Sequence, residues 1–303
     1  MRAIVAIMSW LLVAILSPLI YTLTNFVDKY LLANKVRDYN SLPIYTASVS
    51  FLFGVLWWIV VGFPNLGWQE SGLLILTGII TMFSAVLYFQ ALSIQETSIV
   101  IFLFQLTPVM SWVLAYLLLG ESISGRQLSG FLIILVSTLV MVWPDDKWQL
   151  PTGFWLIMAV NFLYAISGIM MKFVSETNSF SQVVGYESLG IGIGGILIFI
   201  GIPKIRRAFL TTRKEMVKNA LPVVVVNEVL FILAKSLGYF AFMIGPVALV
   251  SVVANIQVFF GIILGYSLTR LFPKLFNERV DKKFLRQKIY SAAILFVGLY
   301  LLT

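Results

Sequence analysis

Two ionisable side chains inside one apolar stretch of this chain are its best candidates for chemistry. Glu228 and Lys235 occur within an apolar segment that runs from Leu221 to Ile244. A charged side chain at the centre of a bilayer costs about 2.5–3.5 kcal/mol on insertion scales, so such residues usually face a bundle interior or a water-filled cavity. The two residues are therefore candidates for contact with a solute inside the membrane.

The spacing of Glu228 and Lys235 places them on the same face of a helix. Residues seven positions apart lie about 20° apart around the helix axis and about 10.5 Å apart along it. Phe231 lies between them on this face. An acid, an aromatic ring and a base in one row suit a small amphipathic or zwitterionic solute. The alternative is a structural ion pair that is bridged through water or neighbouring helices.

The composition indicates a helical membrane protein. The 303 residues are 60% hydrophobic and 11% charged, whereas a soluble domain has about 25% charged residues. The apolar runs are long and repeated, which differs from the short alternating segments of an outer-membrane barrel. The first run, from Ile4 to Phe26, has no small-residue cleavage site, so we expect it to be a retained span.

The residue types that the chain lacks limit its chemistry. It contains no cysteine and no histidine, which removes thiol chemistry, thiolate metal ligands and the commonest general base. No group of acidic residues has metal-ligand spacing, so we expect no enzymatic activity, no metal and no cofactor. A channel is also disfavoured, because no ring of repeated charges and no filter-like segment is visible.

The hydropathy pattern predicts ten transmembrane helices, with boundaries good to a few residues. They are expected at residues 3–26, 43–63, 69–92, 98–119, 127–143, 152–174, 183–202, 221–244, 247–269 and 289–302. Between them lie two basic segments, Pro203–Ala220 and Arg270–Lys288. We interpret both as cytoplasmic loops with lipid head groups as counter-ions, rather than as sites for nucleic acid.

The two halves of the chain align with each other. Tyr88 matches Tyr239 at an offset of 151, and Gln105 matches Asn255 at an offset of 150. Each half contains five predicted spans, and an odd number of spans inverts the second copy. Inverted repeats usually place a solute site near the bilayer midplane, between the two copies.

The boundary between the repeats is expected in the linker Trp143–Pro151, which contains two prolines and three charged residues. The sequence therefore predicts two five-helix repeats, residues 1–146 and residues 147–303. The fold class that follows is an all-α membrane protein of ten transmembrane helices in two inverted five-helix repeats.

A motif set in the first half resembles the EamA-type transporters of the drug/metabolite transporter superfamily. It consists of Tyr88-x-x-Ala91-Leu92, the mid-span Pro108, the turn Gly120-Glu121, and Gly130. The resemblance implies a bundle of five plus five helices and secondary transport of a small metabolite. It also implies a central cavity lined chiefly by spans one, three, four, six, eight and nine. The second half departs from the pattern, because Val258 stands where Pro108 would recur.

Polar side chains recur inside these inner spans, and we expect them to contact the substrate. The predicted substrate-binding residues are Lys235, Glu228, Phe231, Asn227, Tyr239, Tyr88, Gln105, Asn161, Tyr164, Asn255, Tyr21 and Asn25. Asp28 and Lys29, near the end of span one, are interpreted as side chains that reach the membrane interface, with a gating role as the alternative. For Glu187, packing and substrate contact are both open.

The predicted function is a multi-pass secondary transporter in the cytoplasmic membrane of a bacterium or an archaeon. Its substrate would be a small polar or amphipathic metabolite, amino-acid-like or otherwise zwitterionic or anionic, moved by alternating access. The alternative is a flippase for a lipid-linked or phosphorylated sugar. The expected partners are the solute and membrane lipids, with a coupling proton on Glu228 as an option and no nucleic acid. Both a monomer and a homodimer remain open.

Charge placement predicts the orientation of the chain. The loops after spans one, five, seven and nine carry 17 of the 21 Lys and Arg residues when Lys29 is included. Short basic loops remain cytoplasmic. Both termini are therefore expected to face outward, although relatives are usually drawn with both termini inside.

Overall fold

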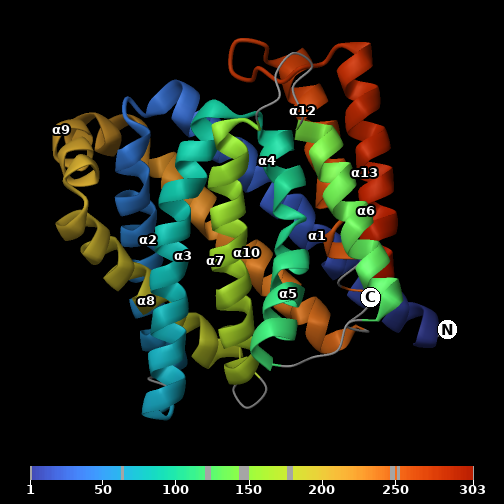
Figure 1. Ribbon diagram of the computed structural model, residues 1–303. Helices are drawn as coiled ribbons and strands as arrows, with labels where there is room; N and C mark the ends of the chain where they lie inside the picture. Colours follow the sequence, from blue (N-terminus) through green and yellow to red (C-terminus); the bar gives the residue numbers. More distant parts are fainter. Residues whose placement is uncertain are drawn as a thin grey trace.

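The computed structural model describes residues 2–62, 65–119, 124–142, 150–175, 180–245, 250 and 253–302, and the regular structure in these residues is helical (Figure 1). The first half contains α1 (Arg2–Tyr30), a π-helical turn (Leu31–Lys35), a 3₁₀ turn (Tyr39–Ser41), α2 (Leu42–Val61), α3 (Trp68–Ile94), α4 (Thr97–Phe104), α5 (Thr107–Leu119) and α6 (Gly125–Val142). The second half contains α7 (Thr152–Ser175), α8 (Phe180–Gly201), α9 (Pro203–Asn219), α10 (Leu221–Ile244), α12 (Gln257–Leu271) and α13 (Lys282–Leu302).

The helices fit the ten predicted passes through a membrane. Eight spans in the described residues are long and apolar enough to cross a bilayer, and α4 and α5 together form one of them. The helices α6 and α12 are apolar but shorter. The chain is thus an all-helical, multi-pass membrane protein, with ten transmembrane helices in two inverted five-helix repeats. The predicted boundary at residues 146 and 147 lies outside the described residues.

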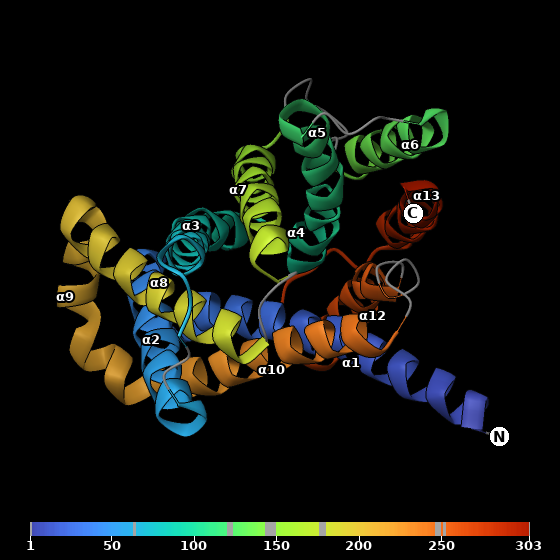
Figure 2. The same cartoon turned by 90° about the horizontal axis from the view of Figure 1, so that it is seen from below.

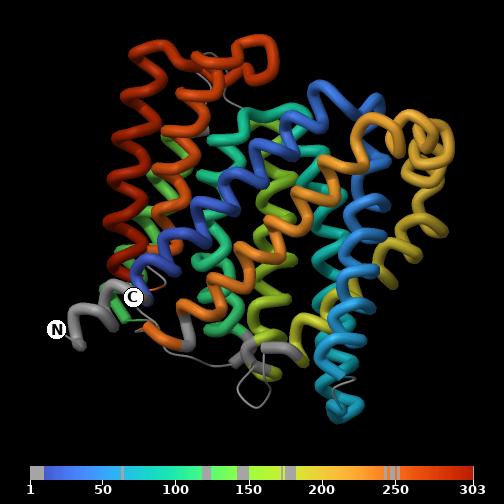
Figure 3. Tube along the Cα trace, turned by 180° about the vertical axis from the view of Figure 1, so that it is seen from behind, coloured from blue at the N-terminus to red at the C-terminus, as the bar shows by residue number. Residues whose placement is uncertain are grey.

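The packing of the helices follows the inverted repeat. The helix α1 packs along α10, and α7 packs along α3. These two pairs are equivalent, because α1 corresponds to α7 and α3 corresponds to α10. Seen from below, α6 and α13 lie together at one edge of the bundle and α9 lies at the opposite edge (Figure 2). The end of α13 lies at one end of the bundle, and the α12–α13 link lies at the other (Figure 3).

The predicted fourth span is interrupted rather than continuous. The chain turns at Gln105 and Leu106, where the backbone N–H of Gln105 donates to the Phe102 carbonyl at 3.1 Å. The second repeat turns at Asn255 and Ile256, which is the same position in the 150-residue alignment. Pro108 follows only the first of these turns, so proline alone does not cause the interruption. The interruption is instead a shared feature of both repeats. Interrupted transmembrane helices are typical of the solute sites of transporters.

The basic segment between α8 and α10 is a helix and not a loop, which corrects the sequence-based interpretation. In α9 the side chains of Ile205, Ala208, Thr212 and Met216 are buried, and the charged side chains are exposed. This period fits an amphipathic helix. Apolar positions are diluted here by six Lys and Arg residues, so hydropathy alone hides the pattern. The second basic segment is also shorter than predicted, because α13 already begins at Lys282.

Glycines let α8 pack closely against α3, because residues without a large side chain allow two helix backbones to approach each other. A Cβ atom added at Gly190 would lie 2.2 Å from the Ile75 carbonyl oxygen. One added at Gly78 would lie 2.2 Å from the Glu187 carbonyl oxygen. The two backbones therefore touch, and this contact fixes the face that α8 presents to the bundle interior.

A buried ionic cluster ties the α12–α13 link to the first repeat. The Nζ atom of Lys288 lies 2.8 Å from Glu96 Oε2, 3.0 Å from Glu278 Oε2 and 2.7 Å from Ser98 Oγ. Arg279 Nε lies 2.8 Å from Glu96 Oε1. Burial alone would raise the pKa of the Glu96 carboxyl, but the charge of Lys288 and hydrogen bonds from Lys288 and Arg279 together hold it below its ordinary value.

Candidate functional site

The bundle contains a central cavity of about 450 Å³ between the two repeats. Side chains from α1, α3, α4, α7, α10 and α12 line it, which are the spans that the family resemblance implies. The helices α2 and α8 also contribute, through Thr46 and Ser50 and through Glu187 and Ile191. A second volume of about 470 Å³ adjoins it and shares lining residues such as Tyr21 and Lys235.

The structure brings most of the predicted site residues together. Nine line the central cavity: Lys235, Glu228, Phe231, Asn227, Tyr239, Tyr88, Tyr164, Tyr21 and Asn25. Gln105 and Asn255, at the two helix interruptions, line the adjoining volume.

Asn161 lies elsewhere. Its side chain is fully buried, and its Nδ2 atom donates to the Leu103 carbonyl at 2.8 Å. Its Oδ1 atom accepts a hydrogen bond from Thr107 Oγ1 at 2.9 Å. Asn161 therefore ties the interruption between α4 and α5 to α7, which supports the shape of the cavity wall.

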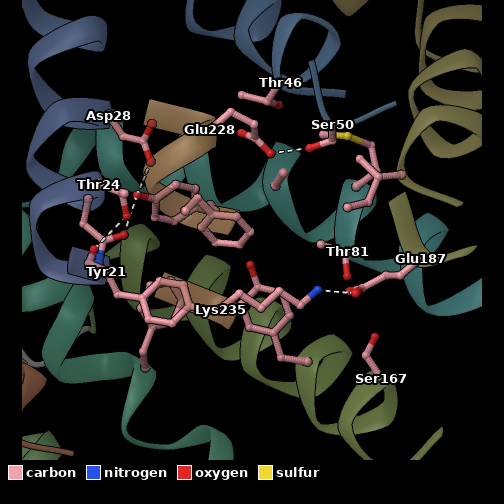
Figure 4. A pocket seen from close by; sticks show the side chains of 18 of the residues that line it. Tyr21, Thr24, Asp28, Thr46, Ser50, Thr81, Ser167, Glu187, Glu228 and Lys235 are labelled. Atoms are coloured by element: carbon pink, nitrogen blue, oxygen red, sulfur yellow. Dashed lines mark hydrogen bonds and ion pairs between the residues drawn. The ribbon is translucent and has the colours of Figure 1, made fainter. Parts of the chain in front are cut away.

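Lys235 and Glu228 both face the cavity but are paired with other residues (Figure 4). The Lys235 ammonium forms an ion pair with Glu187 of α8. The Glu228 carboxylate accepts a hydrogen bond from Ser50 of α2. Because both residues line the same cavity, the common helix face predicted for them is correct. Glu187 packs against a donor, Lys235, and also lines the cavity, so its contact with a substrate stays a prediction.

Asp28 points into the cavity, so its interpretation as an interfacial anchor is wrong. It is 9% exposed and accepts hydrogen bonds from Asn227 Nδ2 at 2.7 Å and from Tyr88 Oη at 2.9 Å. The interfacial interpretation of Lys29 stays a prediction, because its side chain lies at the end of α3. Its Nζ atom donates to the carbonyls of Leu92 and Gln95 at 2.7 and 2.8 Å. Neighbouring residues of a helix point about 100° apart, so one faces the cavity and the other caps α3.

Aromatic rings line the space between the charged groups. The rings of Tyr21 and Phe231 meet edge to face with centroids 5.4 Å apart. Phe104 lies between Tyr88 and Tyr164, with centroid distances of 5.8 and 6.1 Å. Such a wall offers both apolar surface and ring faces to a bound solute.

The sequence-based selection missed several polar side chains of the cavity. They are Thr24, Asp28, Thr46, Ser50, Thr81, Thr107, Ser167, Glu187 and Gln257. Asp28 and Glu187 are charged residues near span ends, where an interfacial position is the usual expectation. A signal was available for Asp28, because it lies seven residues after Tyr21 and therefore on the same face of α1.

Comparison with known proteins agrees with this architecture. A sequence profile of the EamA-like transporter family matches residues 8–143. Over these residues, which are fewer than half of the chain, the sequence is similar to the EamA-like transporter family. This similarity is to a family of membrane transporters, which is not an enzyme family.

Similarity of fold extends beyond the matched residues. A solved structure, described only as a crystal structure of a protein, covers 97% of this chain and 96% of its own, with a TM-score of 0.54 and 14% sequence identity. This similarity concerns the fold alone. Among curated proteins, none matches the sequence.

Proposed function

We propose that this protein is a secondary transporter that moves a small amphipathic metabolite through the central cavity by alternating access. The cytoplasmic membrane of a bacterium or an archaeon is the proposed location. The main support is the position of the cavity. It lies between inverted repeats and beside the two helix interruptions at Gln105 and Asn255, where transporters of this architecture bind solutes.

The side chains of the cavity support an amphipathic solute. One end carries Asp28 and Glu228, the other carries the Lys235–Glu187 pair, and aromatic rings lie between them (Figure 4). A solute with polar groups and an apolar body would match this distribution. The pairing of Lys235 with Glu187 does not favour the alternative, a translocase for a phosphorylated or lipid-linked sugar, since a phosphate would need an available cation.

Transport into proteoliposomes tests the proposal. Lys235→Met keeps much of the side-chain stem and removes the charge, and we expect it to lower solute uptake at least tenfold, as loss of a charged hydrogen bond would. Lys282→Met, which removes an exposed lysine at the start of α13, is the matched control. Full uptake by the Lys235 variant would remove this residue from the site.

Glu228 is the proposed carrier of a coupling proton. Glu228→Gln keeps the shape of the side chain and cannot release a proton at neutral pH. We expect this variant to lose concentrative uptake and to retain equilibration of the solute across the membrane. If concentrative uptake persists at every pH, Glu228 does not carry the proton.

A further inference from the structure

We propose that the acidic end of the cavity, formed by Asp28, Asn227 and Glu228, binds an ammonium group of the solute. This inference rests on the proposed transport function and names the chemical class of its substrate. Asp28 and Glu228 lie at the same end of the cavity, and Asn227 adjoins both, through a hydrogen bond to one and a peptide bond to the other (Figure 4).

The charges along the cavity wall do not balance. The charged side chains that line the cavity in the described residues are Asp28, Glu187, Glu228 and Lys235. Lys235 and Glu187 neutralise each other in an ion pair. Asp28 and Glu228 are then left with the neutral donors Tyr88, Asn227 and Ser50. A buried carboxylate is costly unless a positive charge accompanies it, so this end of the cavity favours a cation.

Asn227 supplies an independent observation that also favours a donor. The residue is 7% exposed, and its Nδ2 atom donates to Asp28 Oδ1 at 2.7 Å. This bond fixes the orientation of the amide, because the carboxylate can only accept. The other amide atom, Oδ1, is buried and has no hydrogen-bond partner among the described residues. Because a buried acceptor without a donor is unfavourable, a donor from a bound solute would stabilise this site.

An ammonium group has the required chemistry. It carries a positive charge and three N–H donors, and the acidic end offers the Asn227 Oδ1 atom and two carboxylates. The apolar part of the solute would lie against the rings of Phe231 and Tyr21, which also line the cavity. A ligand carboxylate or phosphate at this end would instead meet acceptors and like charge. The site therefore selects amines and amino acids over carboxylic acids.

Matched solutes that differ only in charged groups test this selection. Phenethylamine, phenylalanine and 3-phenylpropionate share one skeleton, and the corresponding indole and isobutyl compounds complete three sets. Uptake of all nine into proteoliposomes is measured by mass spectrometry, and their binding to the detergent-solubilised protein is measured by thermal shift. We expect the compounds with an ammonium group to bind and to be taken up at least tenfold faster than the acids.

Variants of Asp28, Asn227 and Glu228 test whether these residues cause the preference for ammonium compounds. We expect Glu228→Gln and Asp28→Asn each to reduce the preference for ammonium compounds about tenfold or more. Asn227→Leu should weaken their binding without changing the charge of the cavity. Glu215→Gln, at an exposed position of α9, is the control and should keep the preference. Thermal unfolding and gel filtration of each variant separate a loss of binding from a loss of folding.

The outcomes distinguish the two proposals. Preferential binding and uptake of the acids would overturn the ammonium site and leave the transport function standing. A preference unchanged in both folded carboxylate variants would also overturn it, as would a lack of binding by every ammonium compound. Binding of ammonium compounds without any uptake would overturn the transport function and support the ammonium site.

Discussion

Removing the buried ammonium of Lys288 should destabilise the protein far more than removing the exposed guanidinium beside it. The side chain of Lys288 is 4% exposed and contacts Glu96 and Glu278. Arg279 and Lys288 both lie 2.8 Å from the Glu96 carboxylate. The Arg279 side chain, however, is 61% exposed. The two residues thus share Glu96 but differ in burial, and Lys288 also contacts Glu278.

The expected magnitudes follow from this difference. Lys288→Met leaves the Glu278 carboxylate, whose side chain is 5% exposed, without its cation. Breaking a buried ion pair in this way costs about 3–5 kcal/mol. An exposed pair contributes about 0–1 kcal/mol, so Arg279→Met should lower the free energy of unfolding by about 1 kcal/mol or less. The double variant Lys288→Met/Glu278→Gln should recover part of the loss, because it removes the unpaired charge.

Reversible unfolding by SDS in mixed micelles measures these free energies. Gel filtration before the titration confirms that each variant starts from a folded state. A loss below about 1 kcal/mol for Lys288→Met, the range of an exposed pair, would refute the reasoning. Equal losses for Lys288→Met and Arg279→Met would refute it as well, since burial would then not decide the cost.

Three further predictions concern packing, pH and orientation. Gly190→Ala forces a methyl group against the Ile75 carbonyl and should cost about 1–3 kcal/mol of unfolding free energy in SDS; Gly72→Ala, which meets no described atom within 4 Å, should be neutral or stabilising. Because folding lowers the pKa of Glu96, its contribution to stability should persist above its ordinary pKa of about 4.3 and disappear as the pH falls through the lower, folded value. The free energy of unfolding, measured from pH 7 to pH 3, should show this loss. If Glu96→Gln has the same pH profile as the unmodified protein, the prediction for Glu96 is wrong. Thr211→Cys, exposed on α9, should resist a membrane-impermeant thiol reagent until cells are opened; labelling of intact cells would show that the predicted orientation is wrong.

Much of the fold could be predicted from the sequence, because its physical basis is local. Runs of apolar residues long enough to cross a bilayer specify transmembrane helices without reference to tertiary contacts. The helical period alone placed Glu228 and Lys235 on one face, and the structure confirms that both line the cavity. The extent of α9 was not predicted, because six basic residues lower the hydropathy of an amphipathic helix whose buried face depends on its neighbours.

The partners of the charged residues were decided only by the tertiary structure. Lys235 pairs with Glu187, 48 positions away, and Asp28 pairs with Asn227, 199 positions away. Periodicity gives the angle between two side chains on one helix, but it does not give the rotation of that helix relative to another. That rotation is set by packing such as the glycine contact between α3 and α8, which aims Glu187 at the cavity. The sequence alone therefore determined a helical membrane protein with charges inside it. Helix packing determined that Asp28 and Glu228 have no counter-ion among the described residues that line the cavity.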